Sequence, residues 1–190
     1  TVHFCDVEPT YCMLDPTEAS RIVDRHVGVI APVHYGGHVA PMERIVALAG
    51  QRGWMVVEDA AHALGAKYRT QDGSSHSVGA CAHSDLCCFS FHPVKHITTG
   101  EGGAVTTNEE HLYRRLLRFR THGETRDVEE LHANDGPWYY EQLDLGFNYR
   151  LTDFQCALGV SQLSRLEEFV SRRRALAARY DAAFAGEAHI

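Results

Sequence analysis

One lysine of this chain stands where its amine could react with a carbonyl group. Lys95 comes soon after the apolar run at residues 85–91, inside a loop rich in serine, threonine and glycine. Burial lowers the pKa of a lysine and makes its amine a nucleophile toward carbonyl carbons. Ser90 and the backbone amides of the same loop suit a phosphate group. The simpler interpretation is a solvated surface lysine, so this segment alone does not decide the function.

A carboxylate follows an earlier apolar run. Asp59 and His62 lie directly after residues 54–57. A buried carboxylate at a strand end is costly unless it meets a cation or hydrogen-bond donors. Taken alone, Asp59 is better explained as the cap of the next turn, and the functional alternative is a carboxylate that faces a protonated heterocyclic nitrogen. Together with Lys95 and a phosphate-binding loop, Asp59 completes a set of groups that suits pyridoxal 5′-phosphate (PLP).

A sheet with helices must position these residues, because short apolar runs alternate with helical patterns along the chain. The predicted strands cover residues 2–7, 27–33, 54–57, 85–91 and 103–107. The predicted helices begin at residues 15–16 and 41 and, further on, at about residues 109 and 152. This alternation predicts an α/β fold with a mostly parallel sheet, and the continuous apolar strands predict that both faces are covered. Ligands of such sheets bind at the carboxyl ends of strands, where the candidate residues fall.

Composition narrows the function classes. The 190 residues carry a net charge of −7, which does not suit general binding to nucleic-acid phosphates. No apolar run is long enough to span a bilayer, and no secretory leader opens the chain. The six cysteines lack paired metal-ligand spacing, and the His-x-x-x-His pairs fall in loops, so we expect no metal site. Reduced core cysteines suit a cytoplasmic protein.

Four segments make the sequence similar to one known family. They are residues 58–62 (EDAAH), 90–95 (SFHPVK), 99–103 (TGEGG) and 146–153 (GFNYRLTD). On these motifs the chain resembles the DegT/StrS sugar aminotransferases, which are PLP enzymes of fold type I. The resemblance implies a three-layer α/β/α large domain with a mostly parallel sheet, incomplete here. That PLP-binding domain would occupy residues 1–150, and a long helix over residues 151–190 would lead towards a small C-terminal domain.

Three shorter segments point to one branch of the family. Residues 33–37, 97–99 and 138–141 resemble the branch that acts in pseudaminic acid synthesis. The resemblance implies transfer of an amino group to C4 of a UDP-linked 4-keto-6-deoxy-N-acetyl hexose. The donor in that branch is normally glutamate. A nucleotide sugar and an amino acid are therefore the expected substrates.

The resemblance assigns a role to four residues of one site. Lys95 matches the lysine that bonds covalently to PLP and then shuttles a proton between the sugar carbon and the cofactor. Asp59 matches the partner of the pyridine nitrogen. His62 matches a residue that lies against the cofactor near its phenolic oxygen, and Ser90 matches a phosphate ligand. Relatives that deoxygenate sugars carry histidine in place of the lysine, so Lys95 favours transamination.

Two further matches imply a homodimer with shared active sites. Asn148 matches a residue that reaches the cofactor phosphate of the neighbouring subunit. Arg150 matches a residue near the substrate in that same shared site. The expected partners are therefore a nucleotide-sugar substrate, an amino-acid donor and a second copy of the chain.

The sequence also departs from the family. The family's early Gly-Thr/Ser turn, which holds the phosphate, and an aromatic residue beside the ring have no counterpart, because the match begins downstream of them. The chain opens on Thr1 and closes near a helical pattern, so we expect a fragment. One strand of the family's sheet would lie between residues 2–7 and 27–33 and is missing, so a gap is expected there.

Three alternatives remain beside transamination. A truncated, non-catalytic or regulatory member of the same fold predicts no stable PLP binding. An isomerase or lyase that uses the same PLP site stays open, because a fold does not fix a reaction. A nicotinamide oxidoreductase would need a glycine-rich first turn, which the sequence lacks.

Overall fold

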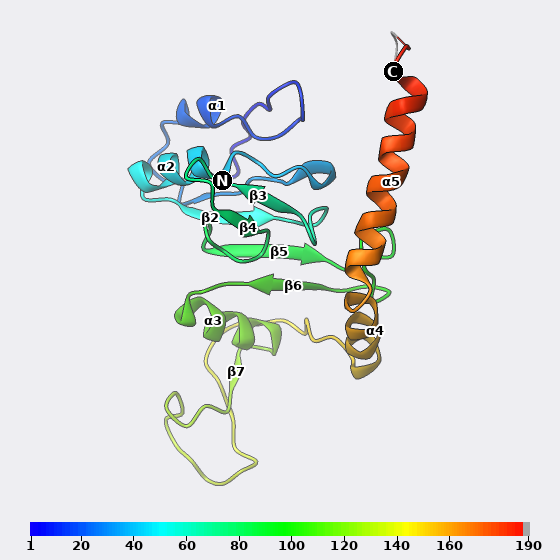
Figure 1. Ribbon diagram of the computed structural model, residues 1–190. Helices are drawn as coiled ribbons and strands as arrows, with labels where there is room; N and C mark the ends of the chain where they lie inside the picture. Colours follow the sequence, from blue (N-terminus) through cyan, green and yellow to red (C-terminus); the bar gives the residue numbers. More distant parts are fainter. Residues whose placement is uncertain (188–190) are drawn as a thin grey trace.

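A computed structural model describes residues 1–187 of the chain (Figure 1). The helical elements are α1 (Pro16–Ser20), a short 3-10 turn (Tyr35–Gly37), α2 (Met42–Arg52), α3 (Glu110–Arg120), α4 (Asp153–Leu163) and α5 (Leu166–Phe184). The strands are β1 (Val29–Ile30), β2 (Met55–Asp59), β3 (Lys67–Arg69), β4 (Ser75–Ser77), β5 (Leu86–Ser90), β6 (Gly103–Thr106), β7 (Glu124–Thr125) and β8 (Glu141–Gln142).

The main sheet has the strand order β1-β2-β5-β6. β1, β2 and β5 run parallel to one another, and β6 runs antiparallel to β5. The α/β class and the mostly parallel sheet are therefore confirmed. The two small hairpins, β3-β4 and β7-β8, were not predicted from the sequence.

Helix ends fall where local chemistry places them. Asp15 caps α1 by accepting a hydrogen bond from the Thr17 amide at 2.8 Å, and Pro16 fits the first turn. α2 ends at Gly53, whose φ of 66° lies in the left-handed region that glycine adopts without strain. Thr152 caps α4 and exchanges hydrogen bonds with Gln155 in a capping box. The starts of α1 and α4 follow the sequence prediction.

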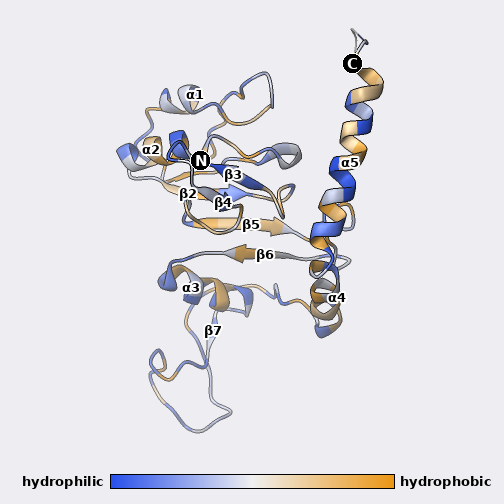
Figure 2. Cartoon of the chain, in the orientation of Figure 1, coloured by the Kyte–Doolittle hydropathy of each residue, from blue (hydrophilic) through white to orange (hydrophobic). Residues whose placement is uncertain are grey.

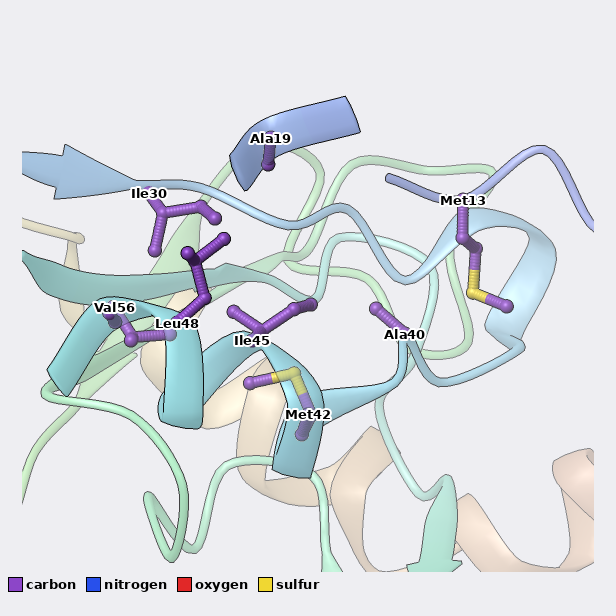
Figure 3. Close-up of a cluster of buried hydrophobic side chains, with 9 residues drawn as sticks. Met13, Ala19, Ile30, Ala40, Met42, Ile45, Leu48 and Val56 are labelled. Carbon is purple, nitrogen blue, oxygen red and sulfur yellow. The ribbon is translucent and has the colours of Figure 1, made fainter. Parts of the chain in front are cut away.

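The core gathers on the α2 side of β1 and β2. Met42, Ile45 and Leu48 project from α2 towards Ile30 of β1 and Val56 of β2 (Figure 3). A second buried cluster lies between β2, β5 and the β3-β4 hairpin, formed by Ala60, Ala63, Val78, Cys81 and Cys87. These clusters fix the strands whose ends carry the candidate site.

One expectation about the sheet is wrong, and another is met only in part. Residues 2–7 do not form a strand, and Val7 makes only an isolated bridge with Leu14. No described strand lies beside this segment, so Phe4 is 93% exposed. Burial also alternates along β2, where Val56 and Glu58 are buried and their neighbours are half-buried. In β2, therefore, one face is buried and the other is half-buried.

The single long helix expected from Thr152 is two helices. α4 ends at Leu163 and α5 begins at Leu166. The Ser164 hydroxyl donates to the Ser161 carbonyl at 2.8 Å, and such side-chain bonds compete with the helical backbone. No glycine or proline marks this break, so the apolar pattern reads as continuous in the sequence.

α5 stands at the end of the sheet towards which β5 points (Figure 1). Its surface alternates between hydrophilic and hydrophobic residues, whereas β5 and β6 are mainly hydrophobic (Figure 2). The segment between β7 and α4 extends away from the sheet (Figure 1). None of the helices described is both long and apolar enough to cross a membrane.

Candidate active site

Two candidate residues end neighbouring strands. β2 ends at Asp59 and β5 ends at Ser90. The strands are parallel and Asp59 lies opposite Cys88, so Asp59 and Ser90 share the carboxyl edge of the sheet. One carboxylate oxygen of Asp59 accepts the Ala61 amide at 3.0 Å, as the capping interpretation predicts. The Ser90 hydroxyl oxygen accepts the His92 amide at 3.3 Å, which leaves its own proton available to donate.

Lys95 lies in the loop between β5 and β6, and backbone hydrogen bonds join the two ends of this loop. The amide of Thr99 donates to the Phe91 carbonyl at 3.0 Å, and the Phe91 amide donates to the Gly102 carbonyl at 2.8 Å. Within this loop the Lys95 amide donates to the His92 carbonyl at 3.0 Å. The Lys95 side chain is half-buried and makes no ion pair within the described residues. The Lys95 backbone is therefore held close to the end of β5, and its amine has no acidic partner in that part of the chain.

His62 lies beside the loop that follows β1. The Gly36 amide donates to His62 Nδ1 at 3.4 Å, so the neutral ring carries its proton on Nε2. Gly37 has a φ of 89°, and a Cβ atom there would lie 3.1 Å from the His62 carbonyl oxygen. Glycine at this position lets the loop approach His62 closely. The Tyr35 ring lies 5.9 Å from the His62 ring, measured between centroids.

A cavity of about 530 Å³ joins His62 and Lys95. Its walls come from the loop after β1, the turn after β2, the loop after β5 and one side of α5. Asp59 and Ser90 are not part of these walls. The structure thus brings Lys95 and His62 to one cavity, and Asp59 and Ser90 to the adjoining strand edge.

His96 follows Lys95 and also lines this cavity. Burial lowers the pKa of His96, and the nearby positive charges of Arg173 and Lys95 lower it further. The Nδ1 atom of His96 is buried and has no hydrogen-bond partner in the described part of the chain. This imidazole was not predicted as a site residue from the sequence.

Asn148 and Arg150 lie apart from the other candidates. Both side chains are exposed, and neither lines the cavity. The backbone next to these two residues is held against the end of α3. Asn148 forms an isolated antiparallel β-bridge with Thr121, and the Tyr149 amide donates a hydrogen bond to the Arg120 carbonyl at 3.0 Å. A single chain does not bring these two residues to Lys95.

A buried polar pair supports the carboxyl edge, and sequence reasoning missed it. His34 and Glu58 are almost fully buried, and His34 Nε2 lies 2.6 Å from a Glu58 carboxylate oxygen. The Ala40 amide donates to His34 Nδ1 at 3.1 Å, so the ring proton lies on Nε2 and faces Glu58. The Ser84 hydroxyl donates to the other Glu58 oxygen. The pair joins the end of β1 to β2 directly beside Asp59.

Strand alternation was the signal that could have found this pair. Successive side chains of a strand point to opposite faces, so Glu58 must share a face with the buried Val56, whereas Asp59 faces the other way. A carboxylate on the buried face requires a partner. The identity of that partner, 24 residues earlier, does not follow from spacing.

The donor set fits PLP in chemical terms. Lys95 offers an amine for an aldehyde, Asp59 offers a carboxylate for a protonated ring nitrogen, and Ser90 offers a hydroxyl for a phosphate. These groups lie on the ends of two adjacent strands and on the loop that follows one of them. By contrast, no three or more His, Cys, Asp or Glu side chains among residues 1–187 are grouped to hold a metal ion.

Comparison with known families decides the membership of the chain. The sequence profile of the DegT/DnrJ/EryC1/StrS aminotransferase family matches residues 1–190. The chain belongs to this family. The resemblance seen in the motifs is therefore confirmed, and PLP is the cofactor of DegT/DnrJ/EryC1/StrS aminotransferases.

Curated relatives and solved structures agree with this membership. The chain is 39% identical over 185 residues to the UDP-4-amino-4,6-dideoxy-N-acetyl-beta-L-altrosamine transaminase of Campylobacter jejuni, which covers 96% of this chain and 45% of that protein. It is 34% identical over 181 residues to the spore coat polysaccharide biosynthesis protein SpsC of Bacillus subtilis, covering 95% of this chain and 45% of that protein. The chain thus spans less than half the length of these relatives.

The fold matches a solved aminotransferase of the same kind. Helicobacter pylori PseC, an aminotransferase involved in the biosynthesis of pseudoaminic acid, superposes with a TM-score of 0.85 at 28% identity, over 99% of this chain and 46% of that one. The PLP form of a Streptococcus pneumoniae protein superposes with a TM-score of 0.82 at 28% identity, over 98% and 48% of the two chains. The same protein has also been solved in its PMP form.

Proposed function

We propose that this chain supplies the PLP-binding part of a nucleotide-sugar aminotransferase. The reaction would transfer an amino group, with glutamate as donor, to the C4 keto group of a nucleotide-linked 4-keto-6-deoxy sugar. The observation that carries the proposal is that Asp59 and Ser90 end two neighbouring parallel strands and that Lys95 lies on the loop that follows Ser90. The similarity to the Campylobacter transaminase and to PseC supports the sugar class.

Each residue would hold a different part of the cofactor. Lys95 Nζ would bind it covalently, Asp59 would keep the ring nitrogen protonated, and Ser90 Oγ would donate to the phosphate. His62 would lie near the cofactor's phenolic oxygen and, with Nδ1 already accepting the Gly36 amide, could present Nε2–H. When bound, PLP supplies an electron sink for the carbon that gains or loses the amino group. Lys95, once released, would carry the proton at that carbon.

The exposed residues support a shared active site in a homodimer. Asn148 and Arg150 are free to reach a neighbouring subunit, because both are exposed. Apolar side chains around them are exposed as well, with Leu145 at 86% and Tyr149 at 69%. We propose that residues 1–150 form the cofactor-binding unit and that residues 151–190 lead towards a small C-terminal domain, with α5 lying against the loop that carries Lys95. The six free cysteines suit the reducing cytoplasm.

The non-catalytic interpretation is not favoured. Such a protein would have no need for the reactive set of Lys95, Asp59 and Ser90, yet the chain carries all three at the ends of β2 and β5 and on the loop after β5. A lysine at position 95 also agrees with transamination rather than sugar dehydration.

The chain offers a sharp test, because it contains only two lysines, Lys67 and Lys95. Lys67 lies on β3 and is exposed, so it serves as a matched control. The chain is mixed with PLP, reduced with borohydride and digested, and the labelled peptide is mapped. We expect the label on Lys95, loss of that label in Lys95→Ala, and no change in Lys67→Ala. Equal labelling of both lysines would contradict the proposal.

A further inference from the structure

The proposed reaction makes no direct use of one buried imidazole, that of His34. Its side chain has no accessible surface, and its partner Glu58, 2.6 Å away, is 1% exposed. Burying two ionisable groups is costly, and an apolar pair of similar volume often stabilises a protein core equally well or better. Stability alone therefore does not account for the pair.

His34 closes the loop of residues 35–39. The ring Nδ1 of His34 accepts the Ala40 amide at 3.1 Å, and the His34 carbonyl accepts the Gly37 amide at 3.2 Å. Gly36 and Gly37 both have a positive φ, and glycine leaves a backbone with wide conformational freedom. The two bonds to His34 therefore restrict a loop whose own sequence would not hold it in one conformation.

This loop forms part of the candidate active site. Gly36, Gly37 and His38 line the same cavity as His62 and Lys95. The Gly36 amide donates to His62 Nδ1 at 3.4 Å, and a Cβ atom at Gly37 would lie 3.1 Å from the His62 carbonyl oxygen. Any shift of the loop would therefore change the contacts that hold His62.

Glu58 determines how the His34 ring is used. A neutral imidazole has one N–H donor and one acceptor nitrogen. The Glu58 carboxylate accepts the proton on Nε2, so Nδ1 is left as the acceptor for the Ala40 amide. The His34 amide also donates to the Asp59 carbonyl at 2.9 Å. His34 thus connects the end of β2 to the loop that lies beside His62.

We propose that His34 is a positioning residue for His62. The inference rests on the proposed function, in which His62 lies against the cofactor. His34 does not line the cavity itself and acts through the loop of residues 35–39. The bond from Nδ1 to the Ala40 amide carries this role, and the bond from Nε2 to Glu58 orients the ring. A purely structural role would instead depend most on the bond to Glu58.

Two amide substitutions separate the two bonds of the His34 ring. Asparagine places an acceptor oxygen where Nδ1 lies but is too short to reach Glu58, so His34→Asn keeps the loop closed. Glutamine places an N–H group where Nε2 lies but offers no acceptor to Ala40, so His34→Gln keeps the partner of Glu58. Ser84→Ala is the control, because it removes another donor to Glu58 and leaves both His34 bonds in place.

The test compares three measurements on each variant. Urea unfolding gives stability, the ring nitrogen shifts of His62 in the chain without PLP show whether Nδ1 still accepts the Gly36 amide, and absorbance gives the affinity for PLP. His34→Gln should change the His62 shifts and weaken PLP binding about tenfold, because a buried amide left without its acceptor costs about that factor. The His62 resonances are assigned by their loss in His62→Gln.

The other two variants should separate positioning from stability. His34→Asn should be less stable than His34→Gln, since a buried carboxylate that loses a donor costs more than an amide that loses an acceptor. It should nevertheless keep the His62 shifts and bind PLP more tightly than His34→Gln. Ser84→Ala should lose stability without a change in the His62 shifts or in PLP affinity.

Three results would overturn the inference. They are PLP affinity and His62 shifts that follow the order of stability, no change of either in His34→Gln, and equal changes of both in Ser84→Ala and His34→Gln. If His34→Asn does not fold, the comparison of His34→Gln with Ser84→Ala decides. The His62 shifts are measured without PLP, so a chain that shows the expected shifts but is not labelled by borohydride at Lys95 refutes the proposed function alone.

Discussion

Two regions of the molecule are stabilised in different ways. Every member of the two buried clusters lies between Met13 and Cys87. From residue 126 to residue 187 no residue is buried. The first region therefore has a hydrophobic core, which is the dominant favourable term in folding, and the second region lacks one.

Polar contacts hold the second region instead. Arg118 reaches from α3 to Glu130 at 2.6 Å and to Asp144 at 2.9 Å. The Glu141 carboxylate accepts hydrogen bonds from the amides of His132 and Ala133 and from the Tyr139 hydroxyl. The difference teaches that burial within residues 13–87 specifies the strand edge with Asp59 and Ser90, whereas local polar contacts order residues 126–150, which carry Asn148 and Arg150.

The largest effect is expected from matched carboxylate deletions in the two regions. Glu58→Ala leaves the buried His34 Nε2–H and the Ser84 hydroxyl without their acceptor, and each buried polar group left unsatisfied costs about 1–3 kcal/mol. Glu130→Ala removes a partner of Arg118, where both side chains are 20% exposed, and solvent-screened pairs contribute about 1 kcal/mol or less. Urea unfolding of both variants measures the difference. Equal losses of unfolding free energy would remove the distinction between the regions.

Truncation of apolar side chains sharpens the same comparison. Ile45 is fully buried on α2, and Ile45→Ala should lower the free energy of unfolding by about 3 kcal/mol through lost burial and a residual cavity. Phe154 on α4 is 90% exposed, so Phe154→Ala should change stability by no more than about 0.5 kcal/mol. Thermal and urea unfolding give both values. A large loss in Phe154→Ala would show that α4 is covered in solution.

Removal of the N-cap of α4 should affect the stability of α4 more than the global stability of the protein. Thr152 accepts the Gln155 amide at 3.3 Å, and Thr152→Ala removes this bond at a cost of about 1 kcal/mol. Because α4 has no buried residue, the loss should appear as fraying of α4 rather than as a shift of global unfolding. Amide hydrogen exchange of α4 and α2 measures the two effects side by side. Thr152→Ser, which keeps the hydroxyl, is the control.

Lowering the pH should disorder the second region before it unfolds the first. Hydrogen bonds from His132, Ala133 and Tyr139 lower the pKa of Glu141 from 4.5 to about 2. The folded loop binds the proton of the Glu141 carboxyl less tightly than the unfolded loop does. The resulting stabilisation of the folded loop is therefore fully present above pH 4.5. It is lost as the pH falls towards 2. Amide chemical shifts of His132 and Ala133 should follow this titration, and Glu141→Gln should abolish it. Unchanged shifts down to pH 2 would contradict the assignment.

The residues at the strand edge could be predicted from the sequence, because their positions relative to the apolar runs determine where they lie. Lys95, Ser90 and Asp59 each follow an apolar run, and parallel strands bring their carboxyl ends to one edge. Membership of the family then supplied roles that spacing could not supply. Residues 2–7 were mispredicted, because an apolar run becomes a strand only when another strand lies beside it.

Contacts over long sequence separations could not be predicted. The His34–Glu58 pair and the bond from Arg173 to the Lys95 carbonyl join residues that are 24 and 78 positions apart. Such contacts depend on how the elements pack, which a single sequence does not show. The break at Ser164 was missed for a different reason, because serine is tolerated inside helices and its competing bond depends on the side-chain rotamer.

The scarcity of lysine has a spectroscopic consequence. With only Lys67 and Lys95 in the chain, isotopic labelling of lysine side chains would give two resonances, one from an exposed strand and one from the cavity. The other sixteen basic side chains are arginines, which stay protonated throughout the alkaline range. In an alkaline titration followed by NMR, the Lys67 resonance would therefore serve as an internal reference for the resonance of Lys95, the proposed reactive amine. The experiment needs neither a mutation nor a bound reporter.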